Sequence, residues 1–297
     1  MFRAGFEILR DKREEKDKKS IGTLRGGSLV ALTEDGKFIG DPRTALIRYL
    51  GLQERVTYDQ NLLFQAGLAN EDLIHEYLDA LGTEYKCEEQ IPVKITTPKG
   101  RTVTGRPDAM LFTDGEPDVL LEYKGIFGAT SAIKNFFGGK RTPKDINILQ
   151  CAFYAKYHGV DGLLIYTNRS HHKQNISPTR QKDIKDINHR AIQKNSKGYI
   201  TGVKPYQSFY DITWQGEDLY VDGEKTVITY ADIMRGYDYV ADLAESQTPP
   251  PRYLDVINVW GEKQWSSNMF YIYDECDHSN WEAFIEGVEL VNSGITG

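Results

Sequence analysis

The chain has 297 residues, of which 40% are hydrophobic and 27% charged, with a net charge of −7. This composition is typical of a folded globular protein, and the length suffices for one large domain or two small ones. It holds no apolar run of the roughly 18–20 residues that a membrane helix needs, and Met1–Ser20 lacks the apolar core of a signal peptide, so we expect no membrane partner and a cytoplasmic location.

The pattern of apolar and turn residues predicts helices that alternate with groups of strands. A short helix is expected over 44–50, and an amphipathic helix over 58–81 ends at Gly82. The later predicted elements are strands over 89–97, 101–112 and 117–124, a helix over 144–158, strands over 161–167, 208–213 and 219–228, and a helix over 231–245. This order predicts an α/β (α+β) fold with a central mixed sheet flanked by helices.

Three segments are expected along the chain. Residues 1–55 form a lead-in or accessory segment, 56–260 the main domain, and 261–297 a tail packed on the core. Within the domain, residues 171–204 form a basic insertion with eight Lys or Arg against two Asp. Such a segment attracts phosphates even in an acidic protein, although it is also typical of a solvated loop.

Acidic and basic side chains interrupt the predicted hairpin. Asp108 lies on the strand before the Asp114-Gly115 turn, and Glu122 and Lys124 share one face of the strand after it. A loop with an odd number of residues would place Asp108 directly opposite Glu122, whereas a two-residue turn would put the carboxylates on opposite faces. Opposed carboxylates repel each other unless a cation lies between them, and Mg²⁺ or Mn²⁺ prefers such oxygen ligands.

A surface hairpin with solvated charges is the alternative interpretation. Two features count against it. Asp108 directly follows Pro107, and Glu122 and Lys124 follow the apolar run Val119-Leu120-Leu121. Charges set into a strand of this kind are costly unless they have a function.

These residues resemble the signature of the PD-(D/E)XK nuclease superfamily. The matching segments are Gly105-Arg106-Pro107-Asp108 and Leu120-Leu121-Glu122-Tyr123-Lys124. The resemblance implies a restriction-endonuclease-like core. It also implies that Asp108, Glu122 and the Tyr123 carbonyl bind one or two Mg²⁺ or Mn²⁺ ions, while Lys124 orients the attacking water or stabilises the transition state.

Two further motifs resemble the RecB-like and lambda-exonuclease-like branch of this superfamily. Gln150 and Tyr154 match its QxxxY motif, which implies contacts with the DNA backbone. Gly67 and Glu71 match its GxxxE element, which makes Glu71 a further catalytic acid and metal ligand. The nearby His75 and Glu76 stay open as alternatives for that upstream ligand.

The cysteines depart from one pattern within this branch. Several RecB-like nucleases hold an iron–sulfur cluster with one upstream and three C-terminal cysteines. This chain has only Cys87, Cys151 and Cys276, which are far apart, so we expect no cluster. The single compact chain without helicase motifs resembles a phage-encoded stand-alone enzyme, which would act in the host cytoplasm.

The sequence therefore predicts a metal-dependent deoxyribonuclease, with an exonuclease in DNA recombination, repair or replication as the leading interpretation. A structure-specific or nicking endonuclease, a non-catalytic DNA-binding relative and a metal-binding protein with an unrelated substrate are the alternatives. The expected partner is single-stranded DNA or a duplex end; a homo-oligomer and a recombination or single-strand-binding partner protein also stay open. Residues expected to contact DNA besides the QxxxY pair are Arg106, Lys134, Lys140 and Arg141.

Overall fold

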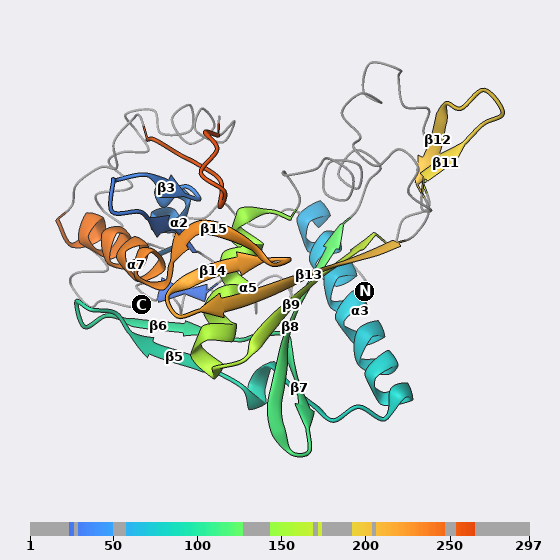
Figure 1. Cartoon of the computed structure of the whole chain (residues 1–297), viewed down its shortest axis with the longest axis horizontal. Helices are drawn as coiled ribbons and strands as arrows, with labels where there is room; N and C mark the ends of the chain where they lie inside the picture. Colours follow the sequence, from blue (N-terminus) through green and yellow to red (C-terminus); the bar gives the residue numbers. More distant parts are fainter. Residues whose placement is uncertain are drawn as a thin grey trace, which may run out of the picture. The chain divides into compact units, whose positions relative to one another are not determined.

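The structure is a computed structural model of the whole chain (Figure 1). It describes residues 24–26, 29–49, 58–126, 143–168, 172–173, 192–203, 206–246 and 254–264. The chain forms two compact units. One unit comprises Met1–Arg55, Val93–Gly105 and Thr226–Gly297, and the other, here called the site unit, comprises Val56–Pro92 and Arg106–Lys225.

A seven-stranded sheet, in the order β15-β14-β13-β9-β8-β7-β4, organises the site unit. Strands β8 and β9 are parallel, whereas the pairs β4–β7, β7–β8, β9–β13 and β13–β14 are antiparallel. The sheet is therefore mixed, as the sequence predicted. Its strands are β4 (Tyr85–Cys87), β7 (Ala109–Thr113), β8 (Glu116–Ile126), β9 (Asp161–Asn168), β13 (Tyr206–Gln215), β14 (Asp218–Val221) and β15 (Glu224–Thr229), which continues into the other unit at Thr226.

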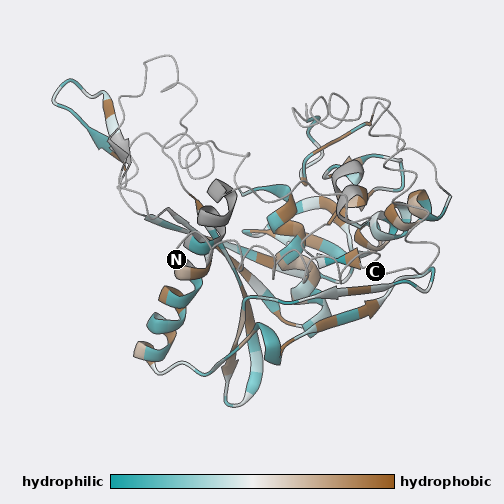
Figure 2. Ribbon diagram, turned by 180° about the vertical axis from the view of Figure 1, so that it is seen from behind, coloured by the Kyte–Doolittle hydropathy of each residue, from teal (hydrophilic) through white to brown (hydrophobic). Residues whose placement is uncertain are grey.

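Two helices cover opposite faces of this sheet. Helix α3 (Tyr58–Leu81) packs through Ile74 on a cluster that includes Leu121 and Tyr123 of β8. Helix α5 (Asp145–His158) lies against the other face, where a Cβ added at Gly162 would meet Cys151 Sγ at 2.7 Å. Gly162 is level with Leu120, so Leu120 and the alternate residues Glu122 and Lys124 face α5. Figure 2 shows α3 with interspersed hydrophilic and hydrophobic residues, as expected for a helix with one packed face.

The helix predictions are confirmed, but two strand predictions were wrong. The predicted strand over 101–112 is two strands in different sheets, β6 (Thr102–Gly105) and β7. Pro107 lies in the break and cannot donate a ladder hydrogen bond. The predicted strand over 219–228 is also divided, by a turn at Asp222-Gly223 in which both residues have positive φ.

Shorter elements complete the described residues. In the first unit, β1, β6 and β5 form one sheet, and β2 and β3 form a hairpin. In the site unit, β10, β12 and β11 form a separate small sheet. Their bounds are β1 (Leu24–Arg25), β2 (Ala31–Leu32), β3 (Phe38–Ile39), α2 (Pro42–Tyr49), η2 (Glu88–Gln90), β5 (Val93–Thr96), β10 (His172–Lys173), β11 (Ile192–Lys194), β12 (Ile200–Val203) and α7 (Tyr230–Glu245). No helix among the described residues is long and apolar enough to cross a membrane.

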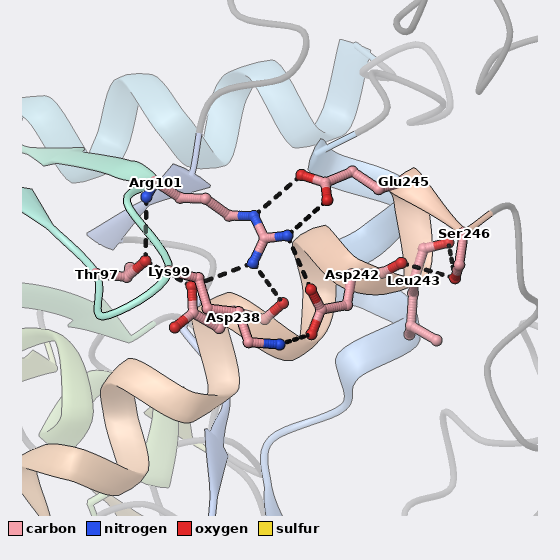
Figure 3. A network of polar contacts seen from close by, with 8 residues as sticks. All are labelled: Thr97, Lys99, Arg101, Asp238, Asp242, Leu243, Glu245 and Ser246. Carbon is pink, nitrogen blue, oxygen red and sulfur yellow. Dashed lines mark hydrogen bonds and ion pairs between the residues drawn. The ribbon is translucent and has the colours of Figure 1, made fainter.

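A polar network joins the β5–β6 turn to α7 within the first unit (Figure 3). The guanidinium group of Arg101 donates to Asp242 at 2.8 Å and to Glu245 at 2.7 Å and 3.1 Å. It also donates to the side chain and the backbone carbonyl of Asp238, both at 3.3 Å. Because the Arg101 side chain is only 15% exposed, its bonds are better shielded from water than those of a surface ion pair.

The substitution Arg101→Ala should lower the free energy of unfolding by about 1–3 kcal/mol, because it leaves the buried Asp238 with fewer partners. Lys99→Ala is the matched control, since Lys99 also binds Asp242 but is 55% exposed, and its loss should cost less than about 1 kcal/mol. Urea unfolding of both variants measures the difference. Equal losses would show that Arg101 is no more than another surface ion pair.

Candidate active site

The β7–β8 hairpin brings Asp108 next to Glu122 by a route that the sequence analysis did not predict. The loop is not odd-numbered: it is a two-residue turn at Asp114-Gly115, in which both residues have positive φ. Phe112 pairs with Pro117, but the next residue away from the turn, Leu111, pairs with Val119. Asp118 is therefore left without a partner residue and is the extra residue of a β-bulge.

The pairing then continues to Ala109 and Leu121, where it ends, and the same register extended by one residue would bring Asp108, which directly precedes β7, level with Glu122. The expected loop was wrong, and the bulge supplies the extra residue that the alignment needs. The two carboxyl groups are therefore close enough for the charge of Asp108 to raise the pKa of Glu122.

Glu122 is fully buried in the sheet, at 0% exposure. One carboxylate oxygen, Oε1, forms an ion pair with Lys124 Nζ. The other, Oε2, is buried without a hydrogen-bond partner among the described residues. Burial raises the pKa of Glu122 to about 8, and the charge of Asp108 acts in the same direction while Lys124 opposes it. A buried carboxylate with an unsatisfied oxygen is costly and is typical of a functional site.

Asp108 reaches toward the next strand. Its Oδ2 accepts a hydrogen bond of 2.5 Å from the backbone N–H of Tyr123. Burial raises the pKa of Asp108, although the charge of Lys124 and the Tyr123 N–H act to lower it. This bond fixes one oxygen of Asp108 against the backbone between Glu122 and Lys124.

Lys124 remains partly accessible, with 23% of its side chain exposed. Burial acts to lower the pKa of Lys124, but the negative charges of Glu122 and Asp108 outweigh burial and raise it above the ordinary value. Lys124 is therefore a fixed positive charge that sits beside two acids and still reaches solvent.

Glu71 contributes a third acid from helix α3. It is half-buried, and burial raises the pKa of its carboxyl to about 7, with the charges of Asp108 and Glu88 adding to the effect. Of the upstream candidates, Glu71 and His75 line a cavity together with Asp108, whereas Glu76 is exposed and does not line it.

This cavity has a volume of about 440 Å³. Its lining residues are Glu71, His75, Cys87, Glu88, Glu89, Gln90 and Asp108. The sequence analysis missed the contribution of Cys87–Gln90 because it expected a strand to begin at 89, whereas Glu88–Gln90 form a 3-10 turn. The consecutive acids Glu88 and Glu89 were the available signal.

Cys87 and His75 face each other at this cavity. Cys87 Sγ lies 3.7 Å from His75 Nε2, and the His75 ring stacks on Tyr85 with the ring centroids 5.4 Å apart. As the side chains stand, no group of three or more His, Cys, Asp or Glu within the described residues is arranged to hold a metal ion. The three acids influence one another electrostatically without forming a complete coordination shell.

Helix α5, on the face of the sheet opposite to α3, contributes the QxxxY pair Gln150 and Tyr154. Tyr154 is 2% exposed, and its hydroxyl is hydrogen-bonded to the Gln150 side chain and to the backbone of Arg106. Burial raises the pKa of Tyr154, with the nearby charge of Glu122 adding to the effect. The QxxxY pair is thus brought together with the segment that leads into Pro107 and Asp108.

The remaining predicted residues are placed as follows. Tyr123 is 3% exposed, with its ring in the cluster under α3 and its hydroxyl without a partner among the described residues. The Arg106 side chain is exposed. Lys134, Lys140 and Arg141 lie outside the described residues.

Comparisons with known proteins do not assign a family. No protein-family model matches the chain, and no curated protein matches it. Among solved structures, the chain is similar to the protein of the "Crystal structure of SSO0001". The two are 14% identical over 84% of this chain and 89% of that one, with a TM-score of 0.40. This similarity is too low to indicate a shared fold or function, so a functional assignment depends on the site itself.

Proposed function

We propose that the chain is a metal-dependent DNA nuclease that hydrolyses phosphodiester bonds at Glu71, Asp108, Glu122 and Lys124. The observation that carries the proposal is the buried Glu122 carboxylate, with one oxygen paired to Lys124 and the other without a described partner. A solvated surface hairpin, which was the alternative interpretation, would not bury a carboxylate completely.

The chemical type of the donors suits a divalent cation, although the acids must move from their present positions to share one ion. Glu71, Asp108 and Glu122 supply carboxylate oxygens, which suit Mg²⁺ or Mn²⁺, and the unsatisfied Glu122 Oε2 is a buried atom that a cation would satisfy. The Tyr123 carbonyl is the backbone ligand that the PD-(D/E)XK resemblance implies. When bound, such an ion supplies Lewis-acid polarisation of the phosphate and neutralises charge in the transition state.

Lys124 supplies the fixed positive charge of the reaction. Its ammonium group is held by Glu122 and its side chain is 23% exposed, and its proposed partner is a phosphate oxygen or the attacking water. Two neighbouring acids keep Lys124 protonated throughout the neutral range, because they raise its pKa. Its proposed roles are therefore to orient the nucleophile and to stabilise negative charge that develops on the phosphate.

Tyr154 has a different proposed role from the DNA contact expected from the sequence. A side chain that is 2% exposed offers little surface to a nucleic-acid strand. Its hydroxyl instead joins Gln150 to the Arg106 backbone, two residues before Asp108. We therefore assign Tyr154 as a positioning residue that holds the β6–β7 connection, and Gln150 as its partner.

Cleavage of end-labelled single- and double-stranded DNA with Mg²⁺ or Mn²⁺ tests this function. We expect time-dependent product that stops when EDTA removes the metal. A covalently closed circle, included in the same series, distinguishes the two nuclease classes, because an exonuclease leaves it intact and an endonuclease cuts it. DNA binding with no cleavage under any metal condition would contradict the proposal and favour a non-catalytic DNA-binding protein.

A further inference from the structure

The small sheet formed by β10, β12 and β11 contains a β-hairpin that is basic, in contrast to the acidic chain as a whole. The hairpin comprises β11, its turn and β12, residues 192–203, and is here called the basic hairpin. It contains Lys194 and Lys197 and no acidic residue, although the whole chain has a net charge of −7. It lies within the basic segment 171–204, whose sequence contains eight Lys or Arg and two Asp.

The turn of the basic hairpin is held in one conformation. The side-chain oxygen of Asn195 accepts hydrogen bonds from the backbone N–H groups of Lys197 at 3.0 Å and Tyr199 at 2.9 Å. The backbone of Asn195 also donates to the Tyr199 carbonyl at 2.9 Å. The buried Ile200, at 1% exposure, anchors the base of the turn. A preorganised turn lowers the entropy cost of presenting its side chains to a partner.

The exposed side chains at this turn suit a nucleic acid. Residues 194–199 are all exposed, and Tyr199 keeps 47% of its surface accessible. Lysine binds phosphate, and an exposed aromatic ring stacks on unpaired bases of any sequence. Figure 2 colours the end of the β11–β12 hairpin predominantly hydrophilic, which fits a charged partner better than an apolar protein surface.

The basic hairpin is connected to one particular end of the seven-stranded sheet. At this end β8 stops at Ile126, two residues after Lys124. Asn168 is level with both Ile126 of β8 and Tyr206 of β13. The chain leaves the main sheet at Asn168 for β10 and returns from β12 at Tyr206. A maximum of about 3.5 Å per residue limits the path from Lys197 to Tyr206 to about 30 Å. Two strand spacings add about 10 Å, and the two residues from Ile126 back to Lys124 add about 7 Å.

We infer that the basic hairpin is a DNA-binding element that contacts the substrate at a distance from the cleaved bond, with Lys197 on a phosphate and Tyr199 on a base. An upper limit of about 47 Å corresponds to at most about 14 nucleotides along a duplex strand, at about 3.4 Å per nucleotide. The inference rests on the proposed nuclease function, because it takes DNA as the partner and Lys124 as the point from which the reach is measured.

The test compares DNA binding by full-length variants, measured by fluorescence anisotropy with Ca²⁺, a hard cation that also prefers oxygen ligands. The probes are a 30-nucleotide single strand and the corresponding duplex. On the 30-nucleotide strand, Tyr199→Ala should weaken binding about 5- to 100-fold. Lys197→Gln should reduce the slope of log K against log salt by about 1.

Two controls match these substitutions in chemistry and in exposure. Lys225→Gln removes another exposed lysine of the site unit, and Tyr77→Ala removes a tyrosine that is 55% exposed on α3. Neither control should change the binding of any probe.

The outcomes separate this inference from the proposed function. If the wild type cleaves DNA and both hairpin variants bind the 30-nucleotide strand with unchanged affinity and salt dependence, the inference is overturned and the function stands. If the wild type neither binds nor cleaves DNA, both are overturned. If Lys197→Gln acts on duplex and single strand alike while Tyr199→Ala acts on the single strand alone, both assigned contacts are supported.

Discussion

Lys124→Gln should reduce DNA cleavage by about 10²- to 10³-fold while the protein stays folded, because the substitution removes the positive charge nearest the two strand acids. Glutamine keeps a hydrogen-bond donor within reach of Glu122, so the buried carboxylate retains a polar partner. The loss should appear mainly in kcat, since a charge that stabilises the transition state contributes less to the binding of the ground state. Single-turnover cleavage of end-labelled DNA measures it directly.

Lys86→Gln is the control for this substitution. Lys86 is an exposed lysine on β4 of the same sheet, and its ammonium group lies over the Phe112 ring. Its replacement removes the same charge from the protein without touching the acids, so cleavage should change less than about twofold. Equal losses in both variants would assign the effect to overall charge and would remove Lys124 from the catalytic machinery.

Glu122→Gln should abolish cleavage and at the same time stabilise the metal-free protein at pH 8. The folded state raises the pKa of Glu122 to about 8 and that of Glu71 to about 7, so it binds protons more tightly than the unfolded chain. The stability that these two groups contribute to the metal-free wild type is therefore fully present below the ordinary carboxyl pKa and is lost as pH rises through about 7 and 8. A neutral amide removes the Glu122 part of that loss.

Urea unfolding in EDTA at pH 5 and pH 8 tests whether Glu122 lowers the stability of the metal-free protein. Glu122→Gln should exceed the wild type by about 1–3 kcal/mol at pH 8, and the difference should shrink at pH 5, where the wild-type carboxyl is itself protonated. Glu116→Gln, at the exposed start of the same strand, should change neither value. A metal-free wild type more stable than Glu122→Gln at pH 8 would contradict the cost assigned to the buried carboxylate.

Local signals in the sequence were enough to predict the helices and the central strands of the site unit. The apolar period and a terminal glycine defined α3 and α5. The strand over 117–124 lies within β8, because its apolar run is long and bounded by the Asp114-Gly115 turn. These features depend on residues close together in the chain, which is why a sequence pattern can predict them.

Features that depend on distant contacts could not be predicted in the same way. The bulge at Asp118 has no distinctive residue type, so the turn alone indicated a register that would have separated Asp108 from Glu122. The chain changes sheets at Arg106–Asp108 because β6 and β7 pair with different strands, and Pro107 marks that break only in hindsight. Likewise, the cavity lining at Cys87–Gln90 depends on its packing beside Glu71 and Asp108.

Thermal unfolding at pH 8 with increasing Mn²⁺ tests the central claim most directly, because it asks whether the strand acids hold a divalent ion without requiring turnover. The wild type should gain stability with Mn²⁺, by about 2.7 kcal/mol at a concentration one hundred times the Kd, whereas Glu122→Gln and Asp108→Asn should gain little. If all three proteins gain the same stability, the ion binds elsewhere, and the site assigned to Asp108 and Glu122 would be wrong.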